Sequence, residues 1–119
     1  MNNFPENFVW GVSTSSYQIE GSVEMDGRGK TIWDTFCENP KNIIDQSSGA
    51  VACEHYQRYP EDILLMVDLG VKAYRFSTAW SRVQPQGFGK VNKAGIDFYK
   101  RLVDSLLENN IEPWLCLNH

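Results

Sequence analysis

The chain has 119 residues, of which 42% are hydrophobic and 13% aromatic, and this composition is typical of a folded domain and excludes a disordered segment. Its formal net charge is −4 and its lysines and arginines are scattered, so we expect no nucleic-acid partner, because no basic patch is available to neutralise phosphates. No apolar stretch reaches the roughly 20 residues that a membrane-spanning helix needs, so we expect no membrane partner either.

The N-terminal segment and the cysteines bear on the cellular compartment. The first eight residues, MNNFPENF, contain no basic stretch followed by an apolar one, and so do not resemble a secretory signal. The three cysteines, Cys37, Cys53 and Cys116, are odd in number, and their spacings match neither a zinc site nor a redox pair. We therefore expect reduced thiols in a cytoplasmic protein.

The first predicted element is a buried strand over residues 8–13, an apolar run that contains one glycine. A loop with three glycines is expected over residues 14–30. A short helix is then predicted over residues 31–36, because Thr31 can cap it and Asp34 follows at the spacing of an acidic capping box. Residues 38–50 are expected to form a further loop.

The next helical pattern begins near Ala52 and contains a proline. Pro60 is expected to interrupt this pattern and to become the first residue of a new helix, with Glu61 and Asp62 at the positive end of the helix dipole. Gly70 is expected to end that helix in the left-handed conformation.

Two more strands and one more helix complete the predicted elements. Residues 71–77 have high β propensity and are predicted to form the second strand, followed by a loop rich in glycine and proline. A helix is predicted over residues 93–108, capped by Asn92, because its apolar residues recur at helical spacing. Residues 111–119 are predicted to be the third strand.

This alternation of strands and helices predicts a parallel α/β sheet with right-handed crossovers. Three such strands with both helices on one face would leave the other face bare and the third strand as an exposed apolar edge. We therefore expect the N-terminal portion of a (β/α)8 barrel, a fold of about 250 residues, in a chain truncated at the end of the third strand. An authentic small three-stranded domain remains the alternative.

Strand alternation predicts which side chains face the barrel interior. It places Arg75 on the side of the second strand that carries small residues, opposite Tyr74 and Phe76. The aromatic side belongs against the helices, so we expect Arg75 to face the interior, where its charge needs carboxylate partners. His119 ends the third strand and Gln18 follows the first, at the rim where barrels of this kind place their active sites.

We expect Gln18, Arg75 and His119 to converge on one pocket for a polyhydroxylated ligand. A glutamine amide can bridge two vicinal hydroxyls, and a histidine can bind a third. The structural alternative for these three is a loop anchor, an ion-pair partner and an ordinary strand-end residue. Three tryptophans are candidates for stacking on a sugar ring, although plain core packing is the favoured interpretation of any single one: Trp10, Trp33 and Trp80.

A metal-dependent hydrolase is a further alternative with less support. It needs several histidine or aspartate ligands at strand ends, whereas the chain has only His55 and His119, and His55 falls on the first helical segment. We therefore expect neither a metal nor a cofactor.

The segment FVWGVSTSSYQIEGS at residues 8–22 resembles the N-terminal signature of glycoside hydrolase family 1, the β-glucosidase family. The stretches DGRGKTIWDTF, EHYQRYPEDILLMVDLGVKAYRFSTAWSRVQP and GIDFYKRLVDSLLENNIEPWLCLNH continue the resemblance in order, over essentially the whole chain. The resemblance implies that residues 1–119 are the N-terminal part of a single (β/α)8 catalytic domain of a retaining β-glycosidase. The positions that fit the signature are Phe8, Trp10, Gly11, Ser13, Ser15, Ser16, Tyr17, Gln18, Glu20 and Ser22.

The same resemblance implies roles for individual residues. Gln18 and His119 would bind hydroxyls of the sugar in the cleaved subsite, and Arg75 would lie beside the nucleophilic carboxylate. Glu20 belongs to the signature, but we interpret it as a structural hydrogen-bonding residue. Asn118 stands where many relatives carry tyrosine, and alternation is expected to point it away from the pocket, with little effect on chemistry.

The two catalytic glutamates of the family have no counterpart in this chain. One belongs to an Asn-Glu-Pro motif and the other to a later Glu-Asn-Gly-like motif, and both are expected beyond residue 119. Glu112 lies at the start of the third strand, at the wrong end of a barrel, and Glu108 lies at a helix terminus. Because a retaining mechanism needs two carboxyl groups about 5–5.5 Å apart, the isolated chain is expected to be inactive.

The expected function is that of a cytoplasmic β-glucosidase acting on terminal non-reducing β-D-glucosyl residues of a small β-glucoside or oligosaccharide. One alternative is a 6-phospho-β-glycosidase, which would need a basic phosphate site that the sequence does not show. The other is a non-catalytic sugar-binding relative that keeps the barrel but has lost the glutamates.

Overall fold

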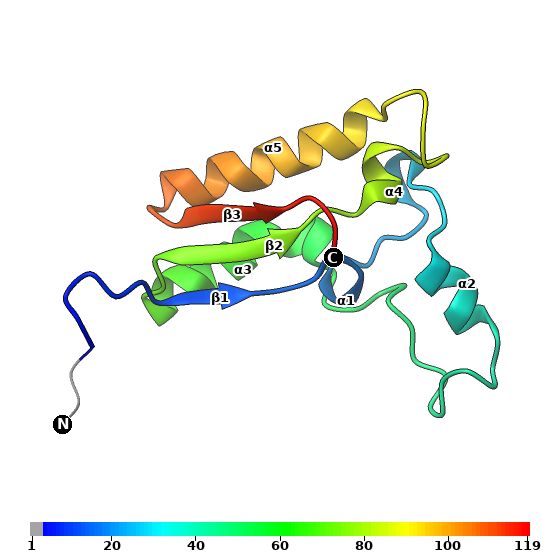
Figure 1. Cartoon of the computed structure of the whole chain (residues 1–119), viewed down its shortest axis with the longest axis horizontal. Helices are drawn as coiled ribbons and strands as arrows, with labels where there is room; N and C mark the ends of the chain where they lie inside the picture. Colours follow the sequence, from blue (N-terminus) through cyan, green and yellow to red (C-terminus); the bar gives the residue numbers. More distant parts are fainter. Residues whose placement is uncertain (1–3) are drawn as a thin grey trace.

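The computed structural model describes residues 4–119 and contains one parallel sheet (Figure 1). The central strand β2 pairs with β1 on one side, where Ser13 lies opposite Arg75, and with β3 on the other, where Arg75 lies opposite Trp114. The strands are shorter than predicted: β1 is Gly11–Ser13, β2 is Ala73–Ser77 and β3 is Glu112–Cys116. Their order and parallel direction confirm the predicted topology.

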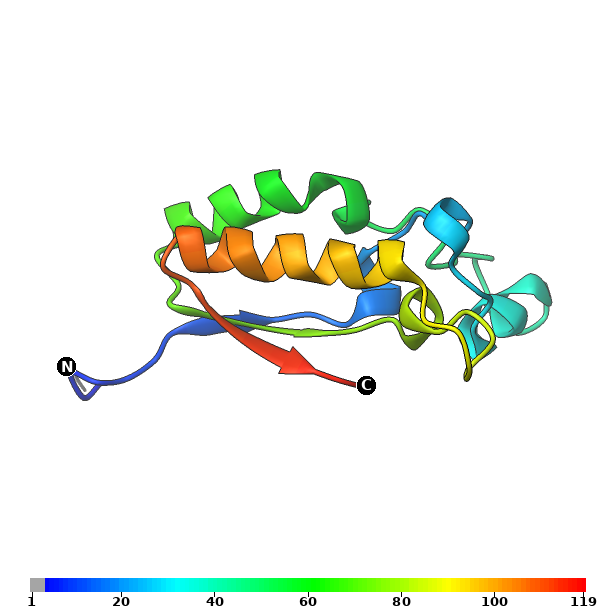
Figure 2. The same cartoon turned by 90° about the horizontal axis from the view of Figure 1, so that it is seen from above.

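Two long helices cover one face of this sheet. The helices α3 (His55–Leu69) and α5 (Lys93–Glu108) lie side by side above it, and neither covers the opposite face (Figure 2). The buried side chains of Ile63 and Phe98 join Tyr74 and Phe76 of β2 in one core cluster. The aromatic side of β2 therefore faces the helices, as the alternation of its residues predicted.

The helix α2, Ile32–Glu38, begins as predicted. The hydroxyl of Thr31 accepts a hydrogen bond from the Asp34 N–H at 3.2 Å, and the Asp34 carboxylate accepts one from the Thr31 N–H at 2.6 Å. This is the predicted acidic capping box, which satisfies two backbone donors at the helix start.

The predicted break at Pro60 is wrong. Pro60 lies inside α3, which starts at His55 and runs without interruption to Leu69. The buried His55 and Tyr56 before the proline, and the buried Ile63 after it, hold both halves of the helix in place, so tertiary packing overrides the local preference. The predicted stop is confirmed, since Gly70 has φ +77°.

The bounds of α5 agree with the prediction, but its start does not use the predicted side-chain cap. Asn92 is the N-cap residue, yet its side chain makes no capping hydrogen bond. Instead its amide nitrogen donates to the carbonyls of Asp26, at 2.8 Å, and Arg82, at 2.9 Å. Asn92 therefore joins two other segments to the start of the helix.

Three short helical elements occupy segments predicted as loops: α1 at Ser16–Ile19, the 3-10 turn η1 at Met25–Gly27 and α4 at Trp80–Val83. Such short turns have little stability of their own and no long apolar period, so local patterns do not reveal them. The elements α1 and α4 follow β1 and β2 directly, and both therefore lie at the carboxyl edge of the sheet (Figure 1).

The described residues also bear on the cysteines and on membrane-spanning helices. The three cysteines carry free thiols. Within residues 4–119, no helix combines the length and the apolar character needed to cross a bilayer.

Candidate functional site

A cavity of about 730 Å³ lies at the carboxyl edge of the sheet. Its wall includes Gln18 from the segment after β1, Trp80 from the segment after β2, and His119 from the segment after β3. Loops around α2 complete the wall. This volume falls within the range of about 300–1,000 Å³ that is common for small-molecule sites.

The structure brings two of the three predicted site residues to this cavity. Gln18 and His119 both line it, and both side chains are exposed. Arg75 lies elsewhere, on the sheet face that the helices leave uncovered, where it donates to Ser13 Oγ at 3.2 Å and to Cys116 Sγ at 3.5 Å. Residues 4–119 give Arg75 no carboxylate partner, so the ion pair expected for it is not made within this part of the chain.

The three tryptophans considered for stacking lie at two different ends of the sheet. Trp33 and Trp80 line the cavity, with 51% and 49% of their surfaces exposed. Trp10 does not line the cavity and is therefore not placed to stack on a sugar bound there. It precedes β1 and packs against the rings of Phe4, at 4.6 Å, and Phe8, at 4.8 Å, at the amino end of the strand.

The expectation that Asn118 points away from the pocket is also wrong, because Asn118 lines the cavity together with His119. The strand β3 ends at Cys116 and the chain bends at Leu117, so strict alternation does not extend to the last two residues. The bend is held by the Thr78 hydroxyl, which donates to the Leu117 carbonyl at 2.7 Å. Asn118 is therefore a further candidate for contact with a ligand.

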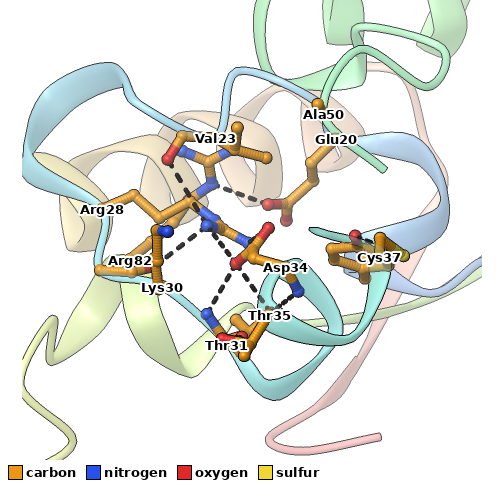
Figure 3. A network of polar contacts seen from close by, with 12 residues as sticks. Glu20, Val23, Arg28, Lys30, Thr31, Asp34, Thr35, Cys37, Ala50 and Arg82 are labelled. Carbon is orange, nitrogen blue, oxygen red and sulfur yellow. Dashed lines mark hydrogen bonds and ion pairs between the residues drawn. The ribbon is translucent and has the colours of Figure 1, made fainter. Parts of the chain in front are cut away.

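Glu20 takes part in a buried network that agrees with its predicted structural role. Its Oε2 accepts from Arg82 Nε at 2.7 Å, and its Oε1 accepts from the Tyr99 hydroxyl at 2.6 Å (Figure 3 shows the Glu20–Arg82 pair). Arg82 is only 1% exposed, and its guanidinium also lies 3.9 Å from the centre of the Tyr56 ring. Burial, followed by the nearby Glu20 charge, raises the pKa of Tyr99, so its hydroxyl remains a donor.

The sequence pattern did not identify Arg82 or Tyr99. Arg82 falls in a segment predicted as a loop, and Tyr99 belongs to the apolar stripe of α5. Glu20 is separated from them by 62 and 79 positions, and helical or strand periodicity carries no information about such distant partners. The one feature that could have pointed to such partners was Glu20 itself, because a buried structural carboxylate must accept hydrogen bonds from buried donors.

A second ion pair anchors α2 and, with it, Trp33. Arg28 Nη1 lies 2.9 Å from Asp34 Oδ2, and the two side chains are 4% and 12% exposed (Figure 3). Burial alone would raise the pKa of Asp34, but the hydrogen bonds from Arg28 and Thr31 outweigh burial and hold that pKa below its ordinary value. The helix that carries Trp33 is therefore fixed at its first turn.

The described wall of the cavity is electrostatically balanced. Its charged side chains, Glu20 and Arg28, are both held in ion pairs. The remaining polar groups are neutral hydroxyls and amides together with the His119 imidazole, a set that suits a neutral polyhydroxylated molecule. Among residues 4–119, no group of three or more histidine, cysteine, aspartate or glutamate side chains could hold a metal ion.

His55, which the sequence placed on a helix, lies in the first turn of α3 and outside the cavity wall. It is buried, and its Nδ1 lies 2.6 Å from Asp62 Oδ2. This position agrees with a role in the fold and separates it from His119.

Comparison with known proteins places this arrangement in a family. The 1,4-beta-D-glucan glucohydrolase of Thermotoga neapolitana is 53% identical over all 119 residues, which are 28% of its own length. The family 1 β-glucosidase of Thermotoga maritima, also at 53% identity, superposes with a TM-score of 0.94 over 98% of this chain and 26% of its own. A variant of a rice β-glucosidase in covalent complex with Glc gives a TM-score of 0.95, again at 53% identity, over 98% of this chain and 24% of its own.

These relatives confirm the predicted fold class, the first three strands and accompanying helices of a (β/α)8 barrel. The chain spans about a quarter of the length of the relatives it matches. The model of glycosyl hydrolase family 1 matches residues 1–119, the whole of the sequence. The chain therefore belongs to glycosyl hydrolase family 1.

Proposed function

We propose that residues 1–119 form part of the sugar-binding site of a retaining β-glucosidase that hydrolyses terminal non-reducing β-D-glucosyl residues. The observation that carries this proposal is the presence of Gln18 and His119 on the wall of one cavity at the carboxyl edge of the sheet. The relatives named as β-glucosidases, of which this chain matches just over a quarter, support it.

In the proposed complex, the pyranose ring lies in this cavity. The Gln18 amide donates to one hydroxyl and accepts from its neighbour, while the His119 imidazole bonds a third. Trp33 and Trp80 offer aromatic faces to the apolar side of the sugar or of the group attached to it. Each neutral hydrogen bond contributes only about 0.5–1.5 kcal/mol, so discrimination comes from the cost of leaving one of these groups unpaired.

We infer that the catalytic glutamates lie outside residues 1–119. In the described wall the only carboxylate is Glu20, and it is already bonded to Arg82 and Tyr99. Glu112 is the first residue of β3, at the edge of the sheet opposite the cavity. Arg75, which has no carboxylate partner among residues 4–119, would stabilise the ionised form of the nucleophile.

The proposal is tested by assaying the complete protein that contains this chain. We expect it to release the aryl group from an aryl β-D-glucoside with retention of configuration, and we expect the isolated 119-residue chain to show no turnover. Turnover by the isolated chain would contradict the assignment of the glutamates to other residues. Absence of glucoside hydrolysis by the complete protein would contradict the proposed activity.

The same assay separates the two alternatives. Hydrolysis of an aryl 6-phospho-β-glucoside with no hydrolysis of the unphosphorylated compound would identify a 6-phospho-β-glycosidase. Tight binding of a glucose-derived inhibitor without hydrolysis of either compound would identify a non-catalytic sugar-binding protein. The described wall favours the unphosphorylated substrate, since its one guanidinium, that of Arg28, is committed to Asp34.

A further inference from the structure

Next to the cavity lies the buried network of Glu20, Arg82 and Tyr99, none of which is a proposed sugar-binding residue. We propose that Tyr99 on α5 is a positioning residue, which acts through Glu20 to fix Gln18 relative to the opposite wall at Trp80. This inference rests on the proposed function, because it takes Gln18 as a sugar-binding residue.

The Tyr99 hydroxyl connects two segments that follow different strands. It donates to Glu20 Oε1 at 2.6 Å, and it accepts from the Ala79 N–H at 2.6 Å. Glu20 closes the short helix that carries Gln18, and Ala79 immediately precedes Trp80. One buried oxygen atom therefore sets the separation between two walls of the cavity.

Arg82 makes a second connection between the same two segments. From α4 its guanidinium reaches Glu20 Oε2 and the Gly21 carbonyl, both at 2.7 Å. Its own carbonyl accepts from Asn92, and its charge lies over the ring of Tyr56. Every polar group of the network has a partner, so the carboxylate of Glu20 has a single well-defined position.

The helix that carries Gln18 depends on these anchors. The element α1 has four residues, too few to be stable in isolation. At its start the Ser16 N–H donates to Ser77 Oγ at 2.9 Å, and at its end Glu20 enters the buried network. Gln18 lies between these two attachments, so a shift of Glu20 moves the Gln18 amide.

The test compares two tyrosine-to-phenylalanine substitutions in the complete protein. Tyr99→Phe removes both hydrogen bonds but keeps the ring and the Glu20–Arg82 ion pair, so we expect the core packing to be retained. Tyr59→Phe is the matched control, because Tyr59 packs against the same Phe98 ring and its hydroxyl has no hydrogen-bond partner among the described residues.

Hydrogen exchange measures the position of the segment independently of activity. The N–H groups of Gln18 and Glu20 donate to the carbonyls of Ser15 and Ser16. We expect Tyr99→Phe to speed exchange of these two amides by about tenfold or more, and Tyr59→Phe to leave them unchanged. Equal exchange of these amides in the two variants would overturn the proposal.

Kinetics then tests whether this position matters for the sugar. We expect Tyr99→Phe to lower kcat/KM for an aryl β-glucoside by about tenfold. In the Tyr99→Phe background, Gln18→Ala is expected to reduce kcat/KM by a factor at least about threefold smaller than in the unmodified protein. The reason is that a displaced Gln18 already contributes less to sugar binding. Identical losses in the two backgrounds would show that Tyr99 is only a structural residue.

Failure of the proposed function and failure of the positioning role give different results. If the unmodified protein hydrolyses no glucoside, the enzymatic assignment is wrong, while the exchange of the Gln18 and Glu20 amides still shows whether Tyr99 fixes this segment. If the protein is active and both the exchange and the kinetic coupling are unchanged, the positioning role is wrong and the enzymatic assignment stands.

Discussion

Gly95 in α5 lies directly against the backbone of Arg82 in α4. A Cβ atom at Gly95 would come within 2.1 Å of the Arg82 carbonyl oxygen and 2.6 Å of its carbon, distances that real contacts do not allow. The same carbonyl accepts a hydrogen bond from Asn92. This close approach sets how near α5, and with it Tyr99, can come to the cavity wall.

We therefore predict that Gly95→Ala destabilises the protein, although a glycine-to-alanine change inside a helix normally stabilises by about 1 kcal/mol. The overlap with the Arg82 backbone is expected to lower the free energy of unfolding by about 1–3 kcal/mol. Urea unfolding measures this change, with Lys100→Ala on the exposed side of α5 as the control. A stabilising effect of Gly95→Ala would contradict the observed contact.

The Arg82–Glu20 ion pair leads to a second prediction. Arg82→Met leaves the Glu20 carboxylate buried without its charged partner, and we expect it to lower the free energy of unfolding by about 3–5 kcal/mol. The control is Lys93→Met, which removes the exposed pair between Lys93 and Asp97 and should leave the unfolding midpoint nearly unchanged. Similar losses in the two variants would mean that the buried pair has no special role.

The pair of Arg82 and Glu20 also shows which features could be predicted from the sequence and which could not. The order of strands and helices was predictable, since apolar periodicity and signals such as the Thr31 cap and Gly70 are local. The partners of Glu20 were not, because the pairing of Arg82 and Tyr99 with it depends on tertiary structure. The prediction at Pro60 was wrong for the opposite reason: a local signal was present, but buried residues on both sides of the proline keep the helix continuous.

The candidate site was predictable to a similar extent. Placing Gln18 and His119 at one rim required only that parallel strands present their carboxyl ends together. The prediction for Asn118 was wrong because β3 ends at Cys116 and alternation does not extend to the last two residues. Trp10 precedes β1 and so lies at the edge of the sheet opposite the cavity. A period of two therefore places side chains within a strand and not beyond its end.

A third prediction concerns acid stability. The pKa of Asp34 is held below its ordinary value of 3.8, so the ionised carboxylate stabilises the folded state. This contribution is complete above that ordinary value and is lost as the pH falls through the lowered pKa of the folded protein. Asp34→Asn keeps an oxygen that can accept the Thr31 bond but removes the charge that faces the buried Arg28 guanidinium. It should therefore lower the free energy of unfolding at neutral pH by about 1.5–3 kcal/mol and flatten its pH dependence below about pH 4.

Unfolding measured as a function of pH tests this expectation. Asp104→Asn makes the same charge change on the exposed surface of α5 and serves as the control. If Asp34→Asn shows the same loss of stability toward acid pH as the unmodified protein, the Arg28–Asp34 pair does not contribute in the way we describe.

A fourth prediction tests the proposed role of Arg75. If its guanidinium lies beside the nucleophilic carboxylate in the complete protein, Arg75→Met raises the pKa of that carboxylate, and the acidic limb of the kcat/KM profile moves up by about one pH unit or more. Arg58→Met, in an exposed pair on α3, is the control. A lower rate with an unshifted pH profile would remove Arg75 from the neighbourhood of the nucleophile.

The most direct test is a crystal structure of the complete protein with a glucose-derived inhibitor. We predict that the Gln18 amide and a nitrogen of His119 both lie within about 2.7–3.2 Å of hydroxyl oxygens on the same pyranose ring. A sugar ring bound out of reach of either residue would contradict the conclusion that the two form a single sugar-binding site.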